Sequence, residues 1–172
     1  MDDEKERKYD DILRAGLSGA AAETVQRYGS AAKEHYVSYS GVDNETGYIL
    51  KKGLKKIADQ KINPDYKFQN IHQQAGFSAE VKDVARTNAE KIIKGSSTRK
   101  IRTDDIGRVN DPLYDTVSVD SNGNVINGTG AQMKFLGASQ KDPLGKKDAI
   151  RALKKLQGKK FEKYLNNDIR ID

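Results

Sequence analysis

"YDTVSVDSNGNVINGTGAQMKFLG" (residues 114–137) contains two strand-like segments separated by turn residues. Residues 114–119 are rich in Thr and Val, which favour strands, and the Asn-Gly pair in "DSNGN" is favoured in hairpin turns. Residues 131–136 form the second segment, where polar and apolar residues alternate. The sequence therefore predicts that 114–119 and 131–136 are neighbouring strands of one sheet.

The second predicted strand has two chemically different faces. Residues two apart in a strand point to the same side, so Gln132 and Lys134 share one face while Met133 and Phe135 occupy the other. Asp115 begins the first strand. If the two strands are neighbours, Asp115, Gln132 and Lys134 meet at one edge of the sheet, with apolar side chains behind them.

The N-terminal part of the chain is predicted to be helical. Apolar residues recur at three- and four-residue spacings over residues 2–39, and three glycines, Gly16, Gly19 and Gly29, favour two helices or a broken one. Residues 48–60 predict a short basic amphipathic helix. We expect this region to pack on the sheet or to contact a partner, and to supply no catalytic group.

The clearest predicted helix spans residues 78–95. Ser78 is placed as its N-cap, Gly95 as its C-terminal cap, and Glu80 lies in its first turn. A separate helical stretch precedes it and ends at Gly76. An acid in a first turn is often only a favourable partner of the helix dipole, which is the structural alternative to a functional role for Glu80.

These elements predict an α+β (mixed α/β) fold in which a small central sheet with a β-meander is flanked by helices. A basic helical stretch follows the meander at residues 141–165. The expected division is an N-terminal helical module over residues 1–62 and an α/β domain over residues 63–172.

The amino-acid composition excludes several kinds of functional site. The chain has 31 Lys and Arg against 25 Asp and Glu, a net charge of +6, which suits a polyanionic partner. It has no cysteine, which excludes disulfides, thiolate zinc sites and a cysteine nucleophile. No apolar run approaches the ~18 residues that span a bilayer, so we expect no membrane partner.

Asp115, Gln132 and Lys134, the polar trio, have the composition of a site that binds a metal ion beside a catalytic base. A carboxylate oxygen from Asp115, the amide oxygen of Gln132 and the carbonyl of Met133 suit a hard cation such as Mg²⁺ (or Mn²⁺). Glu80 could join through a water. A lysine beside such a cation, here Lys134, can hold the attacking water and offset charge that develops on a phosphoryl group. The chemistry that this set fits is phosphodiester hydrolysis.

The chain resembles the PD-(D/E)XK nucleases, the restriction-endonuclease-like superfamily. The features that carry the resemblance are an acid on a helix, an Asp at a strand start, a turn and a strand bearing Gln-x-Lys. The resemblance covers residues 76–137 and is greatest to the nuclease domains of bacterial polymorphic toxins and to resolvase-like members that use Gln-x-Lys. It implies that Asp115 is the central metal ligand, Gln132 replaces the second acid, Lys134 is the catalytic lysine and Glu80 is the helix acid. Gln in place of Glu leaves one fewer negative ligand.

The resemblance also implies partners and a location. The substrate would be DNA or RNA, an immunity or inhibitor protein would be a partner, and the protein would act in the cytoplasm or be delivered into a target-cell cytoplasm as a toxin domain. Around a nuclease cleft, basic residues follow the backbone phosphates. The residues expected to do so are Arg99, Lys100, Arg102, Arg108, Lys146 and Lys147.

Two other function classes remain open from the sequence. One is a non-catalytic nucleic-acid- or protein-binding module of a mobile element, in which the basic stretches are the functional surface. The other is a structural or assembly protein, which the long N-terminal helices favour and the placed polar trio disfavours. His35 and His72 lack a second ligand at the spacing of a zinc site, so we expect them to be surface or packing residues.

Overall fold

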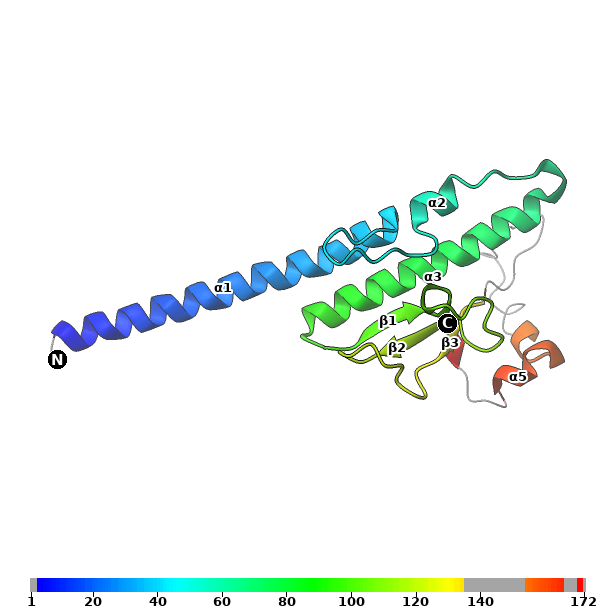
Figure 1. The fold of residues 1–172 in the computed structure, drawn as a ribbon. Coiled ribbons are helices and arrows are strands. Elements are labelled where there is room, and N and C mark those ends of the chain that lie inside the picture. Colours follow the sequence, from blue (N-terminus) through cyan, green and yellow to red (C-terminus); the bar gives the residue numbers. More distant parts are fainter. Residues whose placement is uncertain (1–2, 135–153, 166–169, 172) are drawn as a thin grey trace.

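The computed structural model describes residues 3–134, 154–165 and 170–171 (Figure 1). The described helices and strands are, in chain order, α1 (Asp3–Ser40), α2 (Leu54–Ala58), η1 (Pro64–Tyr66), α3 (Lys67–Ile93), β1 (Arg99–Arg102), η2 (Thr103–Ile106), β2 (Thr116–Val119), β3 (Ala131–Gln132), η3 (Lys159–Phe161), α5 (Glu162–Leu165) and β4 (Arg170–Ile171). Helices on either side of a small sheet confirm the predicted α+β class.

The sheet has the strand order β1-β2-β3-β4. β1 and β2 are antiparallel, β2 and β3 are antiparallel with Thr116 opposite Ala131, and β3 and β4 are parallel. The segments predicted as neighbouring strands are therefore neighbours. Both are shorter than predicted, and positions 135 and 136 lie outside the described residues.

The turn after β2 forms where the Asn-Gly pair predicted it. The N–H of Asp120 donates to the carbonyl of Asn124 at 3.0 Å, and Gly123 has a φ of 82°. The carboxylate of Asp120 also accepts the N–H groups of Asn122 and Asn124, both at 2.9 Å. Glycine is favoured at such a positive φ because it has no Cβ, so the local sequence specifies this turn.

α3 is one continuous helix, so the prediction of two helices separated near Gly76, with Ser78 as an N-cap, is wrong. A glycine inside a helix costs about 1 kcal/mol relative to alanine, which tertiary packing readily outweighs. Glu80 consequently lies in the interior of α3, and a helix-dipole role for it is excluded. The predicted cap at the other end is confirmed, because Gly95 follows the helix with a φ of 71°.

α1 is also a single helix, which corrects the expectation of two helices or a broken one. Its C-terminal part runs antiparallel to α3, and Ala31 and Ser38 are buried there. Arg27 donates to the carbonyl of Ile93 at the end of α3, at 3.3 Å. The part of α1 that precedes Arg27 projects beyond the end of α3 (Figure 1).

The segment between α1 and α2 is a loop with a short bridge between Val42 and Ile49 rather than the start of a helix. The predicted helix over residues 48–60 is therefore limited to α2. Gly53 sets this boundary, since a Cβ added there would lie 2.6 Å from the backbone nitrogen of Gly41. The two glycine backbones touch, and this contact places the loop against the end of α1.

The main core lies between α3 and the sheet. Val81, Ala85 and Val117 are buried in it. Asn88 on α3 protects the edge of β1, because its amide donates to the Lys100 carbonyl at 3.0 Å and accepts the Lys100 N–H at 2.6 Å. A second cluster joins Phe161 and Tyr164 with Leu113, Tyr114 and Leu156.

The predicted boundary near residue 62 stays a prediction, although α1 and α2 both pack against α3. Among the helices of the described residues, none combines the length and the apolar character that crossing a bilayer requires.

The two glycine environments give a stability prediction. Gly76→Ala should raise the free energy of unfolding by about 0.5–1 kcal/mol, because the site is helical and a Cβ there would meet nothing within 4 Å. Gly53→Ala should lower it by about 1–3 kcal/mol, because the new Cβ would overlap the Gly41 backbone. Urea denaturation of both variants measures the two effects, and equal effects would contradict the described contact.

Candidate active site

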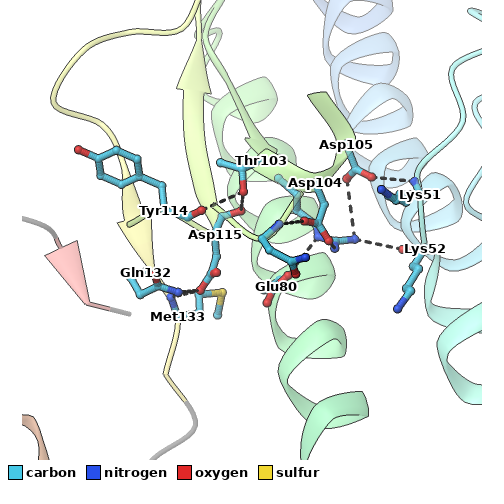
Figure 2. Close-up of polar contacts among 12 residues, drawn as sticks. Lys51, Lys52, Glu80, Thr103, Asp104, Asp105, Tyr114, Asp115, Gln132 and Met133 are labelled. Atoms are coloured by element: carbon cyan, nitrogen blue, oxygen red, sulfur yellow. Dashed lines mark hydrogen bonds and ion pairs between the residues drawn. The ribbon is translucent and has the colours of Figure 1, made fainter. Parts of the chain in front are cut away.

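Asp115 lies immediately before β2, at the end of the sheet where β1 passes into η2. Its carbonyl accepts the Thr103 N–H at 3.0 Å, and its own N–H donates to the Ala131 carbonyl at 2.9 Å. The hydroxyl of Thr103 donates to the Tyr114 carbonyl at 2.9 Å. The backbone of Asp115 is therefore held from both neighbouring chain segments (Figure 2).

The carboxylate of Asp115 reaches across to β3. Its Oδ2 accepts the side-chain amide of Gln132 and the backbone N–H of Met133, the latter at 2.7 Å. Gln132 is only 3% exposed. Because Thr116 pairs with Ala131, the antiparallel register places Asp115 and Gln132 opposite each other on one face. The predicted juxtaposition of these two side chains is present.

Two details differ from the metal-site hypothesis as drawn from the sequence. Gln132 directs its amide nitrogen, not its oxygen, at Asp115. Met133 contributes its N–H rather than its carbonyl. A half-turn of the Gln132 amide exchanges its nitrogen and oxygen without changing the shape of the group, so the residue can also present an acceptor.

Lys134 lies two residues after the end of β3 and against the C-terminal cluster of Phe161 and Tyr164. Its Nζ is 5.2 Å from the centroid of the Tyr164 ring, a cation–π distance. Burial raises the pKa of Asp115, while the Met133 N–H and the charge of Lys134 act in the opposite direction. Lys134 is thus close enough to Asp115 to affect its ionisation.

Glu80 enters from α3 and is engaged by a buried arginine. Arg102 Nε lies 3.2 Å from Glu80, and the same guanidinium bonds Asp104 at 3.1 Å and the Lys52 carbonyl at 3.3 Å. Its side chain is 1% exposed, and Asp105 lies 3.9 Å from it. Figure 2 shows these acids grouped beside Asp115.

Glu80 and Asp105 hold their protons more tightly than a carboxyl group in water does. Burial raises the pKa of Glu80 to about 7; the charge of Arg102 acts against this and that of Asp115 adds to it. Burial also raises the pKa of Asp105, against the N–H of Lys51. The cluster carries more carboxylates than the single guanidinium neutralises, so it favours the approach of a proton or another cation.

The residues expected to contact phosphates lie in different environments, and some of them are buried. Arg102 is buried among acids, and Lys100 is buried with its Nζ 2.5 Å from Asp83, so we withdraw both as nucleic-acid contacts. Arg99 is half-buried and donates to the carbonyls of Ser96 and Thr98. Arg108 is exposed on the turn after η2. Lys146 and Lys147 lie outside the described residues.

Of the two described candidates that remain, Arg99 and Arg108, Arg108 is the one that lies next to the cluster. Its N–H donates to the Thr103 carbonyl at 2.9 Å, and Thr103 also bonds the backbone of Asp115. Arg99 pairs with Val119 at the opposite end of β1, three residues or about 10 Å from Arg102. A nucleic acid bound at Asp115 would therefore meet Arg108 first.

Sequence reasoning missed three residues that shape the site: Thr103, Asp104 and Tyr164. The "RTDD" stretch contained a signal for Asp104, since acids close after an arginine can bind it. Tyr164 lies about 30 residues from Lys134 in the chain, and no local pattern links the two. Only the folded arrangement brings Tyr164 beneath Lys134.

The site offers oxygen donors of the type that Mg²⁺ prefers. Within the parts of the chain that the structure describes, no group of three or more His, Cys, Asp or Glu side chains could hold a metal ion. Asp115, Glu80 and the Gln132 amide are oxygen donors, and Mg²⁺ commonly keeps several waters beside one or two carboxylates. By donor type, these oxygens are of the kind that a partly hydrated Mg²⁺ takes, and the described residues form no fully enclosed site.

Comparison of the chain with protein-family models, with curated proteins and with solved structures gave no match. Function is therefore inferred from the geometry of the cluster.

The buried arginine gives a clear mutational prediction. Arg102→Met should destabilise the protein by about 3–5 kcal/mol, because Glu80, Asp104 and Asp105 would lose their buried partner. Arg86→Met on α3 is the matched control, since its pair with Glu90 is exposed and such pairs contribute about 0–1 kcal/mol. Denaturant unfolding measures both, and a loss below about 1 kcal/mol for Arg102→Met would contradict the role assigned to the pair.

Glu80 gives a pH prediction. Its folded-state pKa of about 7 exceeds the ordinary 4.5, so the folded protein holds this proton more tightly than the unfolded chain does. The resulting stability is fully present below pH 4.5 and is lost as the pH rises through about 7. Relative to Glu80→Gln, which cannot titrate, wild type should lose ~3 kcal/mol of unfolding free energy between about pH 4 and pH 8. Glu90→Gln is the control: Glu90 is exposed and this variant keeps Glu80, so it should lose stability with rising pH as wild type does.

Proposed function

We propose that the protein is a metal-dependent nuclease that hydrolyses phosphodiester bonds of DNA or RNA. The observation that carries the proposal is the meeting of Asp115 and Gln132 across β2 and β3, with Lys134 beside them. Glu80 is close enough for Asp115 to influence its pKa. An acid from a helix, an Asp before a strand and a Gln-x-Lys segment are the parts that the resemblance to PD-(D/E)XK nucleases implies.

Each residue has a definite role in this proposal. Asp115 and the Gln132 oxygen would hold Mg²⁺ or Mn²⁺, and Glu80 would contact it through water. The cation, when bound, supplies charge neutralisation at the phosphoryl oxygens. Lys134 positions the attacking water and offsets the charge that develops on the phosphate. The Tyr164 ring limits where its ammonium can move.

The raised pKa values of Asp115 and Glu80 support a cation site without being sufficient for one. Burial penalises the charged form of both carboxyl groups. A divalent cation would compete with protons for these oxygens, so its affinity should increase with pH. The excess of basic residues in the chain is consistent with a nucleic-acid substrate.

The proposed biological setting follows from the resemblance to toxin nuclease domains. In that setting the domain would act in the cytoplasm of a target cell and would be blocked by an immunity or inhibitor protein. Arg108 and Arg99 remain the described candidates for phosphate contacts.

One observation favours a second function, a non-catalytic nucleic-acid- or protein-binding module of a mobile element. Asp115 already accepts two hydrogen bonds, and Glu80 is paired with Arg102. A polar cluster satisfied in this way can simply stabilise the end of the sheet. The two functions differ in a single property, which is whether the cluster is needed for bond cleavage.

The cleavage test uses plasmid DNA, single-stranded DNA and tRNA with Mg²⁺, with Mn²⁺ and with EDTA. Wild type should cleave at least one substrate only when the cation is present. Lys134→Ala should lower the rate by about two to four decades, the range for a charge-stabilising or proton-transfer group. Asp115→Asn should also abolish cleavage, and the melting temperature should change little in Lys134→Ala.

Lys163→Ala is the matched control for Lys134→Ala. The Lys163 ammonium lies 4.8 Å from the centroid of the same Tyr164 ring, but this lysine comes from α5 and not from the Gln-x-Lys segment. Cleavage should persist in this variant. Cleavage that survives in both Lys134→Ala and Asp115→Asn, or an absence of cation-dependent cleavage on all substrates, would favour the binding module.

A further inference from the structure

A short segment around the start of α2 concentrates positive charge at the surface. Residues 51–56 read KKGLKK, and no acid interrupts them. We call these residues the lysine segment. Three of its four lysines are exposed and Lys52 is half-buried. A local excess of one charge attracts a partner of the opposite sign, so this surface favours an anion.

The backbone of the lysine segment is attached to the acids of the candidate active site. The N–H of Lys51 donates to Asp105 at 2.7 Å, and the carbonyl of Lys52 accepts from Arg102 at 3.3 Å. Arg102 in turn bonds Glu80 at 3.2 Å. Burial raises the pKa of Asp105, and the charge of Lys51 is one of the factors that oppose this rise. One guanidinium therefore separates the lysine segment from Glu80, and Figure 2 shows Lys51 and Lys52 beside Asp105.

Two of the ammonium groups are placed by contacts close to this attachment. Nζ of Lys52 lies 4.1 Å from the centroid of the Phe77 ring. Phe77 precedes Glu80 by three residues in α3, which is less than one helical turn, or about 4.5 Å along the axis. Nζ of Lys56 lies 3.5 Å from the carbonyl of Lys51. The charges of Lys52 and Lys56 therefore lie at the α3 turn that leads to Glu80 and at the loop bound to η2.

The charges of these lysines are not neutralised within the protein, unlike those of the buried bases nearby. Lys100 and Arg102 are each paired with carboxylates. Within the described part of the chain, Lys51, Lys52 and Lys56 form no ion pair. The fourth lysine of the segment, at position 55, pairs with an acid of α2 on the exposed surface. Three cations at the edge of the site are thus available to an anionic ligand.

Two other roles for the lysine segment fit the structure less well. A helix that binds a membrane surface needs an apolar face that enters the lipid. α2 has five residues, and Ile57 is 1% exposed because it packs inside the fold. Neutralisation of the acid cluster is the other role, but the base that lies among these acids is Arg102, whereas Lys51 and Lys56 are exposed.

We propose that Lys51, Lys52 and Lys56 bind the phosphate backbone of a nucleic acid strand that enters the site of Glu80 and Asp115. This role rests on the proposed nuclease function and assigns substrate binding to the region that precedes residue 62. Lysine is a compact point charge on a flexible stem, and phosphate contacts position a strand without reading its bases. The lysine segment therefore binds without sequence preference, and its contribution decreases as salt is added.

Fluorescence anisotropy with labelled single-stranded DNA and RNA oligonucleotides of mixed sequence tests this role. EDTA is present, so that binding is measured without cleavage. Lys51→Gln/Lys52→Gln/Lys56→Gln should lower the affinity for the tighter-binding oligonucleotide at least about tenfold at low salt. The slope of log K against log salt should fall in magnitude by about 2, since each contact to a single strand contributes ~0.7. Comparison of the two oligonucleotides shows whether DNA or RNA is preferred.

A second variant, Lys51→Gln/Lys56→Gln, keeps the contact between Lys52 and Phe77. Both altered side chains are exposed, so its unfolding transition should match that of wild type. The salt slope should fall in magnitude by about 1.4, in proportion to the two contacts removed. A loss of affinity in this variant cannot be attributed to misfolding.

The matched control is Arg7→Gln/Lys8→Gln/Arg14→Gln, which removes the same charge from the projecting part of α1. All three side chains are exposed. Affinity and salt slope should equal those of wild type, because net charge alone is not the cause of binding. In the cleavage assay, the triple variant of the lysine segment should raise KM and leave kcat near the wild-type value, whereas Lys134→Ala should lower kcat.

Three results would overturn the role of the lysine segment. The first is wild-type affinity and salt slope in the triple variant. The second is a control variant that loses as much affinity as the triple variant. The third is a wild-type protein that binds phosphatidylserine vesicles and neither oligonucleotide. Failure of the nuclease proposal gives a different result: wild type binds oligonucleotides through these lysines and does not cleave them with Mg²⁺, which supports the surface as part of a binding module.

Discussion

The buried guanidinium of Arg102 links parts of the chain that would otherwise touch only weakly. It belongs to β1, pairs with Glu80 of α3 and Asp104 of η2, and bonds the Lys52 carbonyl that precedes α2. Removing an arginine from water is costly, and the cost is offset only if its charge and its N–H groups find partners. The positions of α3, the sheet end and the N-terminal loop are therefore mutually dependent, and Asp115 lies at the point where they meet.

The hairpin region was largely predictable because its signals are local. Alternation over two residues, an Asn-Gly turn and strands that are close in the chain, separated by residues 120–130, are enough to place Asp115 opposite Gln132. What the sequence could not reveal is which basic residues turn inward. Lys100 and Arg102 belong to a basic stretch that suggests a phosphate-binding surface, but β1 lies beneath α3, whose acids Asp83 and Glu80 bind them. Burial of a charge depends on a partner that is distant in the chain.

Two helix boundaries could not be predicted from the intrinsic helix propensities of the residues. Gly76 and Ser78 were predicted to end one helix and begin another, yet α3 continues through both. Tertiary packing of a helix outweighs the cost of a single internal glycine. Gly53 marks a boundary where none was predicted. Its backbone touches that of Gly41 and leaves no room for a side chain, and α2 begins only after it. Tyr164, which supports Lys134, was beyond prediction because the contact joins segments without any shared pattern. The roles of Asp115, Gln132, Lys134 and Glu80 in catalysis remain a proposal.

The long α1 helix also determines how the molecule moves through solution. At ~1.5 Å per residue, its 38 residues extend roughly 57 Å, whereas a compact chain of this length has a radius of gyration of about 16 Å. Frictional drag follows shape as well as mass. A single copy should therefore elute from a sizing column ahead of spherical standards of equal mass and diffuse more slowly than they do. Elution volume alone would overstate the number of chains in a particle.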